Sequence, residues 1–294
     1  MQAQTFNNQL IVPPLYEGTL TSSGRVFDIH IDSHHVMSFL PDTTIKSWTY
    51  GMNSDPNNVE MPILGPTMNF HKDEFVTVNV HNGLTHPTTM HWHGFHLPGK
   101  MDGGPHQPIA GGQTWSPYWT VMDEASTMWY HPHLHHHTAQ HVARGLAGMI
   151  IINDDNSDTL PIPKTYNVDD FPLVLQAKEV DETTGVISWT GIDENVSLVN
   201  ATPKAYLDVP PQMVRFRVLN GAVTRNYQLK AAVGVDSRVF VPTDTSWFVG
   251  AADIDSVYRL DPSAMIVGFQ QIGTDGALLE AAVPLNDCLL YTSD

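Results

Sequence analysis

The chain has few cysteines, few basic residues and no long apolar run, and each shortage excludes a class of protein. Its single cysteine, Cys288, permits neither an internal disulfide nor a cysteine-rich zinc site. Lys and Arg total 14 against 31 Asp and Glu, a formal charge of -17, so the surface repels phosphate backbones and we expect no nucleic-acid partner. The longest apolar run, residues 146–152, is far shorter than the roughly 20 residues of a membrane span, and none is predicted.

Histidine is abundant in one half of the chain and missing from the other. All 16 histidines lie at or before His141. The histidine chemistry therefore belongs to the first half, or needs groups from outside this chain. The first 20 residues combine neither a basic start nor an apolar core, so no signal peptide is visible.

The spacing of apolar residues predicts an all-β fold. Residues 75–80 and 214–218 alternate with period 2, as expected of strands with one buried face, and residues 148–152 form a β-branched run suited to a strand covered on both faces. The 21 glycines and 21 prolines leave little room for helices, and only residues 138–146 form a plausible one.

Turn residues recur between these runs, which favours β-sandwiches over other all-β folds. An acidic, proline-containing stretch at residues 153–172 is the predicted linker. We therefore expect two tandem Greek-key β-sandwich domains, residues 1–160 and residues 161–294. The second is expected to be incomplete, because residues 286–294 show no continuing strand pattern.

Two short motifs carry the strongest chemical pattern, His91-Trp92-His93 and His131-Pro132-His133. In a strand, residues i and i+2 point to one face, so each motif projects two imidazoles together. Pro132 has no backbone N–H to donate to a neighbouring strand. The second pair is therefore predicted to lie on a sheet edge or at a strand end. Four imidazoles brought face to face would bind a transition metal, with copper favoured by affinity.

Other histidines are less informative. The histidines that follow the second pair could support the ligands or could form a solvated histidine-rich turn. The role of His96 and His106 is left undecided. The supporting or solvated group comprises His135, His136, His137 and His141. The remaining ones are expected to be structural or on the surface: His30, His34, His35, His71, His81 and His86.

Asp102 is the acid best placed to assist such a site. It lies in a glycine-rich turn nine residues after His93, where it could hydrogen-bond a metal-bound water and relay protons, or serve only as a turn former. A binuclear zinc hydrolase is disfavoured, because Phe95 stands where its ligand acid would be and no histidine follows His141. An amidohydrolase barrel is disfavoured too, because it also needs further histidines after His141.

The sequence around the paired histidines resembles the N-terminal cupredoxin domain of multicopper oxidases, in the three-domain bacterial laccase-like branch that includes the cuprous oxidases. The similarity rests on four segments of the first half, with a weaker match at residues 210–220 and 271–276. The four segments are Thr89-Met90-His91-Trp92-His93-Gly94, Pro98-Gly99-Lys100-Met101-Asp102-Gly103-Gly104-Pro105, Trp129-Tyr130-His131-Pro132-His133 and Arg144-Gly145-Leu146-Ala147-Gly148.

The resemblance implies a role for each motif residue. His91 would bind the type 2 copper, His93 one type 3 copper, and His131 and His133 the type 3 pair, while Asp102 matches the acid beside the type 2 copper. The implied reaction is one-electron oxidation of a phenol, an aromatic amine or a metal ion at a type 1 copper, coupled to reduction of dioxygen to water. Family habit places such enzymes in the periplasm or outside the cell.

Half of the implied ligand set is missing from this sequence. The family's third domain supplies His-x-x-His-x-His and His-Cys-His motifs, and Cys288 has no neighbouring histidine. We therefore expect the N-terminal part of a longer oxidase, inactive alone and needing a third cupredoxin domain. The alternative is a non-catalytic copper-binding cupredoxin protein.

Overall fold

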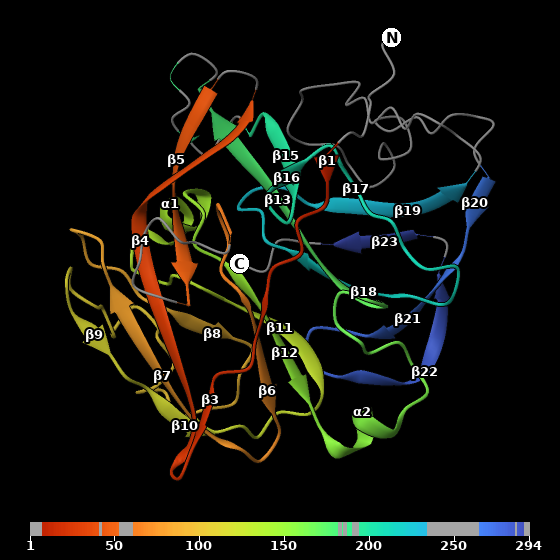
Figure 1. Ribbon diagram of the computed structural model, residues 1–294, viewed down its shortest axis with the longest axis horizontal. Helices are drawn as coiled ribbons and strands as arrows, with labels where there is room; N and C mark the ends of the chain where they lie inside the picture. The colour runs from red at the N-terminus through yellow and green to blue at the C-terminus, as the bar shows by residue number, and fades with distance from the viewer. Residues whose placement is uncertain are drawn as a thin grey trace.

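The protein is built from short strands in several twisted sheets, with two short helices among the described residues (Figure 1). The computed structural model describes residues 8–40, 43–52, 61–181, 184, 187–189, 194–233, 265–285 and 287–290. The predicted all-β class is confirmed. No helix in these ranges is long and apolar enough to cross a membrane.

The first half of the chain forms two facing sheets. The first sheet has the order β10-β7-β4-β3, with β5 on β4 and β9 on β7. Its strands are β3 (Thr19–Thr21), β4 (Gly24–Leu40), β5 (Thr43–Gly51), β7 (Phe75–Asn82), β9 (Thr114–Trp115) and β10 (Tyr118–Thr120). The second sheet has the order β2-β6-β12-β11-β8. Its strands are β2 (Leu15–Tyr16), β6 (Thr67–His71), β8 (His91–His93), β11 (Ser126–His131) and β12 (Gly148–Asn153).

The main core lies between these two sheets. Alternate residues of β7, such as Val76 and Val78, meet Phe70, Trp92 and Ile150 of the second sheet. The predicted period-2 strand is thus confirmed, with its polar residues on the outer face. All of the apolar residues in β12 are buried because its other face is covered as well.

The second half supplies that cover. A third sheet has the order β14-β13-β15-β16, with β18 on β13. Its strands are β13 (Asp170–Val180), β14 (Ile187–Ser188), β15 (Val196–Val199), β16 (Thr202–Pro203) and β18 (Arg215–Asn220). A second core joins Trp129 and Met149 of the second sheet to Val174 and Leu198 of the third.

Polar contacts also join the two halves. Arg217 donates to both carboxylate oxygens of Asp170, and its Nη1 donates to Thr127 Oγ1 across the interface at 2.9 Å. Lys178 Nζ donates to the Val142 carbonyl at 2.9 Å. Near the N-terminus, β1 (Asn8–Gln9) pairs in parallel with β17 (Ala205–Tyr206).

The remaining strands correct one expectation. The last sheets contain β19 (Tyr227–Val233), β20 (Met265–Val267) and β23 (Asp287–Leu290), and a hairpin of β21 (Phe269–Gly273) and β22 (Leu278–Leu285). Residues 286–294 were expected not to continue a strand pattern, and for β23 this is wrong. The register pairs Leu229 with Cys288, so a partner strand distant in sequence supplies the ladder that local alternation did not indicate.

The helices differ from expectation in extent and number. The predicted helix is confirmed as α1 (Thr138–Ala143) but ends early, because Gly145 adopts a φ of 124°. The second helix, α2 (Asp155–Thr159), lies in the predicted linker and was missed. Its start is marked by a capping box, in which the Asp154 carboxylate accepts from Ser157 N–H and Ser157 Oγ from Asp154 N–H.

Candidate metal centre

The first histidine motif forms β8, the edge strand of the second sheet in the described part of the chain. Trp92 is fully buried in the main core, where its ring packs on Trp119 at 5.1 Å between centroids. Because side chains alternate along a strand, burying Trp92 turns His91 and His93 together to the opposite face. The anchoring tryptophan thus determines the direction of both imidazoles.

The second motif reaches the same face through the register of β8 and β11. In this antiparallel pair His131 lies opposite His91, and Trp129 lies opposite His93. Directly opposed residues project to one side of a sheet. His131 is the last residue of β11, so the predicted strand-end position of the Pro132 motif is confirmed.

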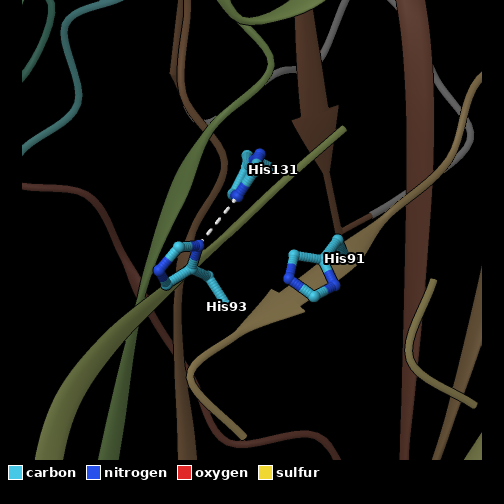
Figure 2. A group of neighbouring side chains, drawn as sticks. All are labelled: His91, His93 and His131. Carbon is cyan, nitrogen blue, oxygen red and sulfur yellow. Dashed lines mark hydrogen bonds between the residues drawn. The ribbon is translucent and has the colours of Figure 1, made fainter. Parts of the chain in front are cut away.

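Three imidazoles converge as a result (Figure 2). The ligand atoms of His91, His93 and His131 all lie within 4.8 Å of one another, and His93 Nδ1 is 3.2 Å from His131 Nε2. Two nitrogens bound to one ion at about 2 Å each lie about 3 Å apart, so this pair fits a shared transition metal. It is the one group of three or more such ligands found within the described ranges.

The hydrogen bonds of these rings decide which nitrogen faces the cluster. His91 Nδ1 donates to the Asp102 carbonyl at 2.8 Å, and His131 Nδ1 donates to the Pro132 carbonyl at 2.8 Å. A carbonyl only accepts, so each Nδ1 carries the proton and Nε2 carries the lone pair. Fixing the tautomer in this way is typical of metal-binding histidines.

Burial favours the neutral form of the His131 imidazole. The side chain is almost wholly enclosed and its ring stacks on Trp129 at 3.9 Å between centroids. Desolvation first, and then the positive charge that His91 would carry, hold the pKa of His131 well below its usual value. Metal binding requires the unprotonated imidazole, which this environment provides at neutral pH.

His133 lies beside the cluster but outside the tight group. Its ring centroid is 5.2 Å from that of His91 and 6.1 Å from that of His131. The turn after β11 is held by its main chain, because His133 N–H donates to Thr89 Oγ1 at 2.5 Å. Thr89 was not singled out from the sequence as a supporting residue, and only its place directly before the first motif pointed to it.

Asp102 reaches the centre chiefly through its backbone. Its carbonyl accepts from His91 Nδ1 at 2.8 Å, while its half-buried carboxylate lies 3.3 Å from the same nitrogen. The loop is tied to β8 by the Trp92 indole N–H, which donates to the Met101 carbonyl. Gly103, at φ 73°, lets the chain pass so close to Met90 that a Cβ there would lie 1.7 Å from its carbonyl oxygen.

Most of the other histidines stack on each other, lie beside carboxylates or are exposed to solvent. His30 and His81 stack on each other on the first sheet, while His71 lies within 4 Å of Asp155 and Asp158. His96 is exposed and its Nδ1 lies 2.6 Å from the buried carboxylate of Asp123. The exposed ones are His86, His106, His135, His136 and His137. The side chains of His34 and His35 lie outside the described part of the chain.

Sequence comparison with known proteins gives two results. The family described as multicopper oxidase matches residues 46–157, which contain all the residues of the centre. A cell division protein FtsP of Photorhabdus laumondii is 34% identical over 230 residues, which are 76% of this chain and 46% of that protein. The chain thus spans about half the length of the curated relatives it matches.

Comparison of structures gives the same fold. The laccase of Pediococcus acidilactici aligns with a TM-score of 0.78 at 26% identity, covering 99% of this chain and 56% of the laccase. The multicopper oxidase McoA of Aquifex aeolicus aligns with a TM-score of 0.76 at 27% identity, covering 99% of this chain and 56% of McoA. The cupredoxin-like sandwich expected from the sequence is confirmed by both.

Proposed function

We propose that this chain, whose residues 46–157 match the multicopper oxidase family, forms part of an oxidase that couples one-electron oxidation of a phenol, an aromatic amine or a metal ion to reduction of dioxygen to water. The observation that supports this most directly is the convergence of His91, His93 and His131 from two paired strands. Imidazole is a good ligand for copper, and three converging imidazoles form a suitable donor set. Copper bound there would pass to dioxygen the electrons that the reductant gives up.

The residues of this chain have distinct parts in that proposal. His91, His93, His131 and His133 hold the type 2 and type 3 copper ions. The main chain at Asp102 keeps His91 in the tautomer that binds metal. The Asp102 carboxylate, about one-third exposed, lies close enough to hold a proton at Oδ1 and pass it to water beside the centre.

The rest of the centre is proposed to come from a third cupredoxin domain. That domain would supply the other trinuclear ligands and the type 1 copper at which the aromatic or metal-ion reductant gives up its electron. Cys288 is not that copper's ligand, because no histidine flanks it. We further propose that the protein works in the periplasm or outside the cell.

A second candidate is a non-catalytic copper-binding cupredoxin protein. One observation favours it: the curated relatives carry the name cell division protein FtsP, which is not the name of an oxidase. Such a protein would use the same histidines to hold copper without transferring electrons to dioxygen.

Copper titration with paramagnetic resonance and an oxygen electrode separates the candidates. The 294-residue chain should bind copper with a type 2 signal and consume no oxygen with a phenolic substrate. The longer gene product should show a blue type 1 signal and oxygen uptake, which His131→Ala abolishes. Copper binding without oxygen uptake by the longer product would favour the second candidate, and absence of copper binding would contradict both.

A further inference from the structure

One face of β11 is shared between the candidate metal centre and the second half of the chain. Thr127, Trp129 and His131 point to this face, because side chains alternate along a strand. The row begins at Thr127, whose Oγ1 accepts from Arg217 of the second half at 2.9 Å. It ends at His131, a member of the metal-binding group. Trp129 lies between them, so this strand face connects the second half to the centre.

Trp129 lies against two of the proposed ligands. Its ring stacks on that of His131, with centroids 3.9 Å apart and planes 21° apart, and its centroid is 5.5 Å from that of His93. The register explains both contacts, because Trp129 lies directly opposite His93 and two residues before His131. Stacked rings at this distance are in van der Waals contact, so the His131 plane cannot tilt toward the indole without a clash. The indole therefore restricts the orientation of a proposed ligand.

The indole is also part of the core that the second half completes. Trp129 is only 6% exposed and belongs to the second core, which contains Val174 and Leu198 of the third sheet. On its other side, in β12, the residue opposite Trp129 is Met149, another member of this core. Because protein interiors are close-packed, a change of volume in a core is felt by its neighbours. Packing in the second half can therefore move the ring against which His131 rests.

We propose that Trp129 is a positioning residue of the metal centre and that the second half, through its packing on Trp129, sets the affinity of the centre for copper. The inference rests on the proposed function in one respect, that His131 binds copper. It gives the second half a part in metal binding although residues 161–294 contain no histidine. That part is apolar packing on a residue that orients a ligand, not ligation.

Two variants of Trp129 test the positioning role. Trp129→Phe keeps a flat ring and should change Cu(II) affinity by less than about threefold. Trp129→Leu keeps an apolar side chain without a flat face and should weaken binding by about tenfold or more. Chelator competition measures the affinity, and urea unfolding confirms that each variant folds. The paramagnetic resonance spectrum of bound Cu(II) should change in Trp129→Leu and stay unchanged in Trp129→Phe. Equal affinities in the two variants would overturn the positioning role.

Two buried leucines of the third sheet test the part of the second half. Leu198 belongs to the second core, whereas Leu175 follows Val174 in β13 and so points to the other side of the sheet. Leu198→Ala should weaken Cu(II) binding by about threefold or more. Leu175→Ala is the matched control for lost stability and should change the affinity by less than about twofold. Equal affinities in these two variants would overturn the role of the second half.

A measurement on the metal-free chain separates this inference from the proposed function. The stacked indole should shift the ring protons of His131 upfield in the NMR spectrum of the histidine-labelled chain. Leu198→Ala should reduce this shift, and Leu175→Ala should preserve it. If the chain binds no copper, a shift reduced in Leu198→Ala still supports the positioning of His131 by the second half, while the oxidase centre fails. Wild-type copper affinity in both Trp129→Leu and Leu198→Ala would overturn the inference and leave the proposed function intact.

Discussion

Replacing Gly103 by alanine should disturb the metal centre more than removing the side chain of Asp102. Gly103 lies at φ 73°, and its added Cβ would be 1.7 Å from the Met90 carbonyl oxygen and 3.0 Å from His91 Cα. An L-residue in this conformation costs about 1–2 kcal/mol. The clash forces a further movement of the loop, by about 1 Å or more before ordinary contact distances return.

That movement acts directly on a proposed ligand. The Asp102 carbonyl, adjacent to Gly103, accepts from His91 Nδ1 at 2.8 Å, and a shift of about 1 Å takes it beyond hydrogen-bonding range. Loss of a partner that orients a metal-binding histidine typically costs about 10–100-fold in affinity. Asp102→Ala keeps the carbonyl and removes only the carboxylate, so Cu(II) affinity should fall by less than about tenfold.

Chelator competition measures the affinities, and urea unfolding confirms that each variant folds. Gly112 provides a matched control, because its φ is 74° and an added Cβ would meet nothing within 4 Å. Gly112→Ala therefore reports the backbone strain without the clash. Unchanged Cu(II) affinity in folded Gly103→Ala, or a larger loss in Asp102→Ala, would refute the argument that the main chain holds His91.

Three further predictions concern the joined halves and the core. Asp170→Asn leaves the buried Arg217 charge unpaired and should lower the free energy of unfolding by about 3–5 kcal/mol in urea; a loss under about 1 kcal/mol would contradict this. Gly148→Ala places a Cβ 2.1 Å from the Tyr130 ring and should cost about 1–3 kcal/mol or more, whereas unchanged stability would show that the ring can move. Burial lowers the pKa of Lys178 to about 7. Between pH 7 and about 10.5 the unfolded state therefore binds more protons than the folded state. The free energy of unfolding should rise with pH in this range by up to about 1.4 kcal/mol per pH unit. Lys178→Met should remove this contribution to the slope in unfolding curves across that pH range, and an unaltered slope would show that Lys178 is not the source.

Sequence periodicity predicted the buried face of β7 correctly but was wrong for residues 214–218, because in β18 Arg217 is buried against Asp170 while Phe216 is exposed. Residues 75–80 alternate because one face of β7 meets the core and the other meets solvent. Periodicity failed for α2 and β23. The helix is short and depends on the reciprocal cap of Asp154 and Ser157, and β23 depends on pairing with β19. Neither a helix cap nor pairing with a strand distant in sequence produces a periodic pattern of apolar residues.

The candidate centre was predictable as a group but not in its internal arrangement. The spacing of His91 and His93 indicated a shared direction, and the structure brings His131 to them. The sequence predicted four ligands brought face to face, whereas His133 lies outside the tight group of three. Asp102 was considered for its carboxylate, yet its carbonyl makes the shorter contact with His91.

By itself, the sequence determined the fold class and the residues able to bind a metal, because alternation and imidazole chemistry are local properties. Only the tertiary structure decided how those residues meet. The register of β8 against β11 places His131 opposite His91, and a shift of one residue would turn one set away. That register depends on the burial of Trp92 and Tyr130 in one core and Trp129 in another, and burial is set by the whole fold.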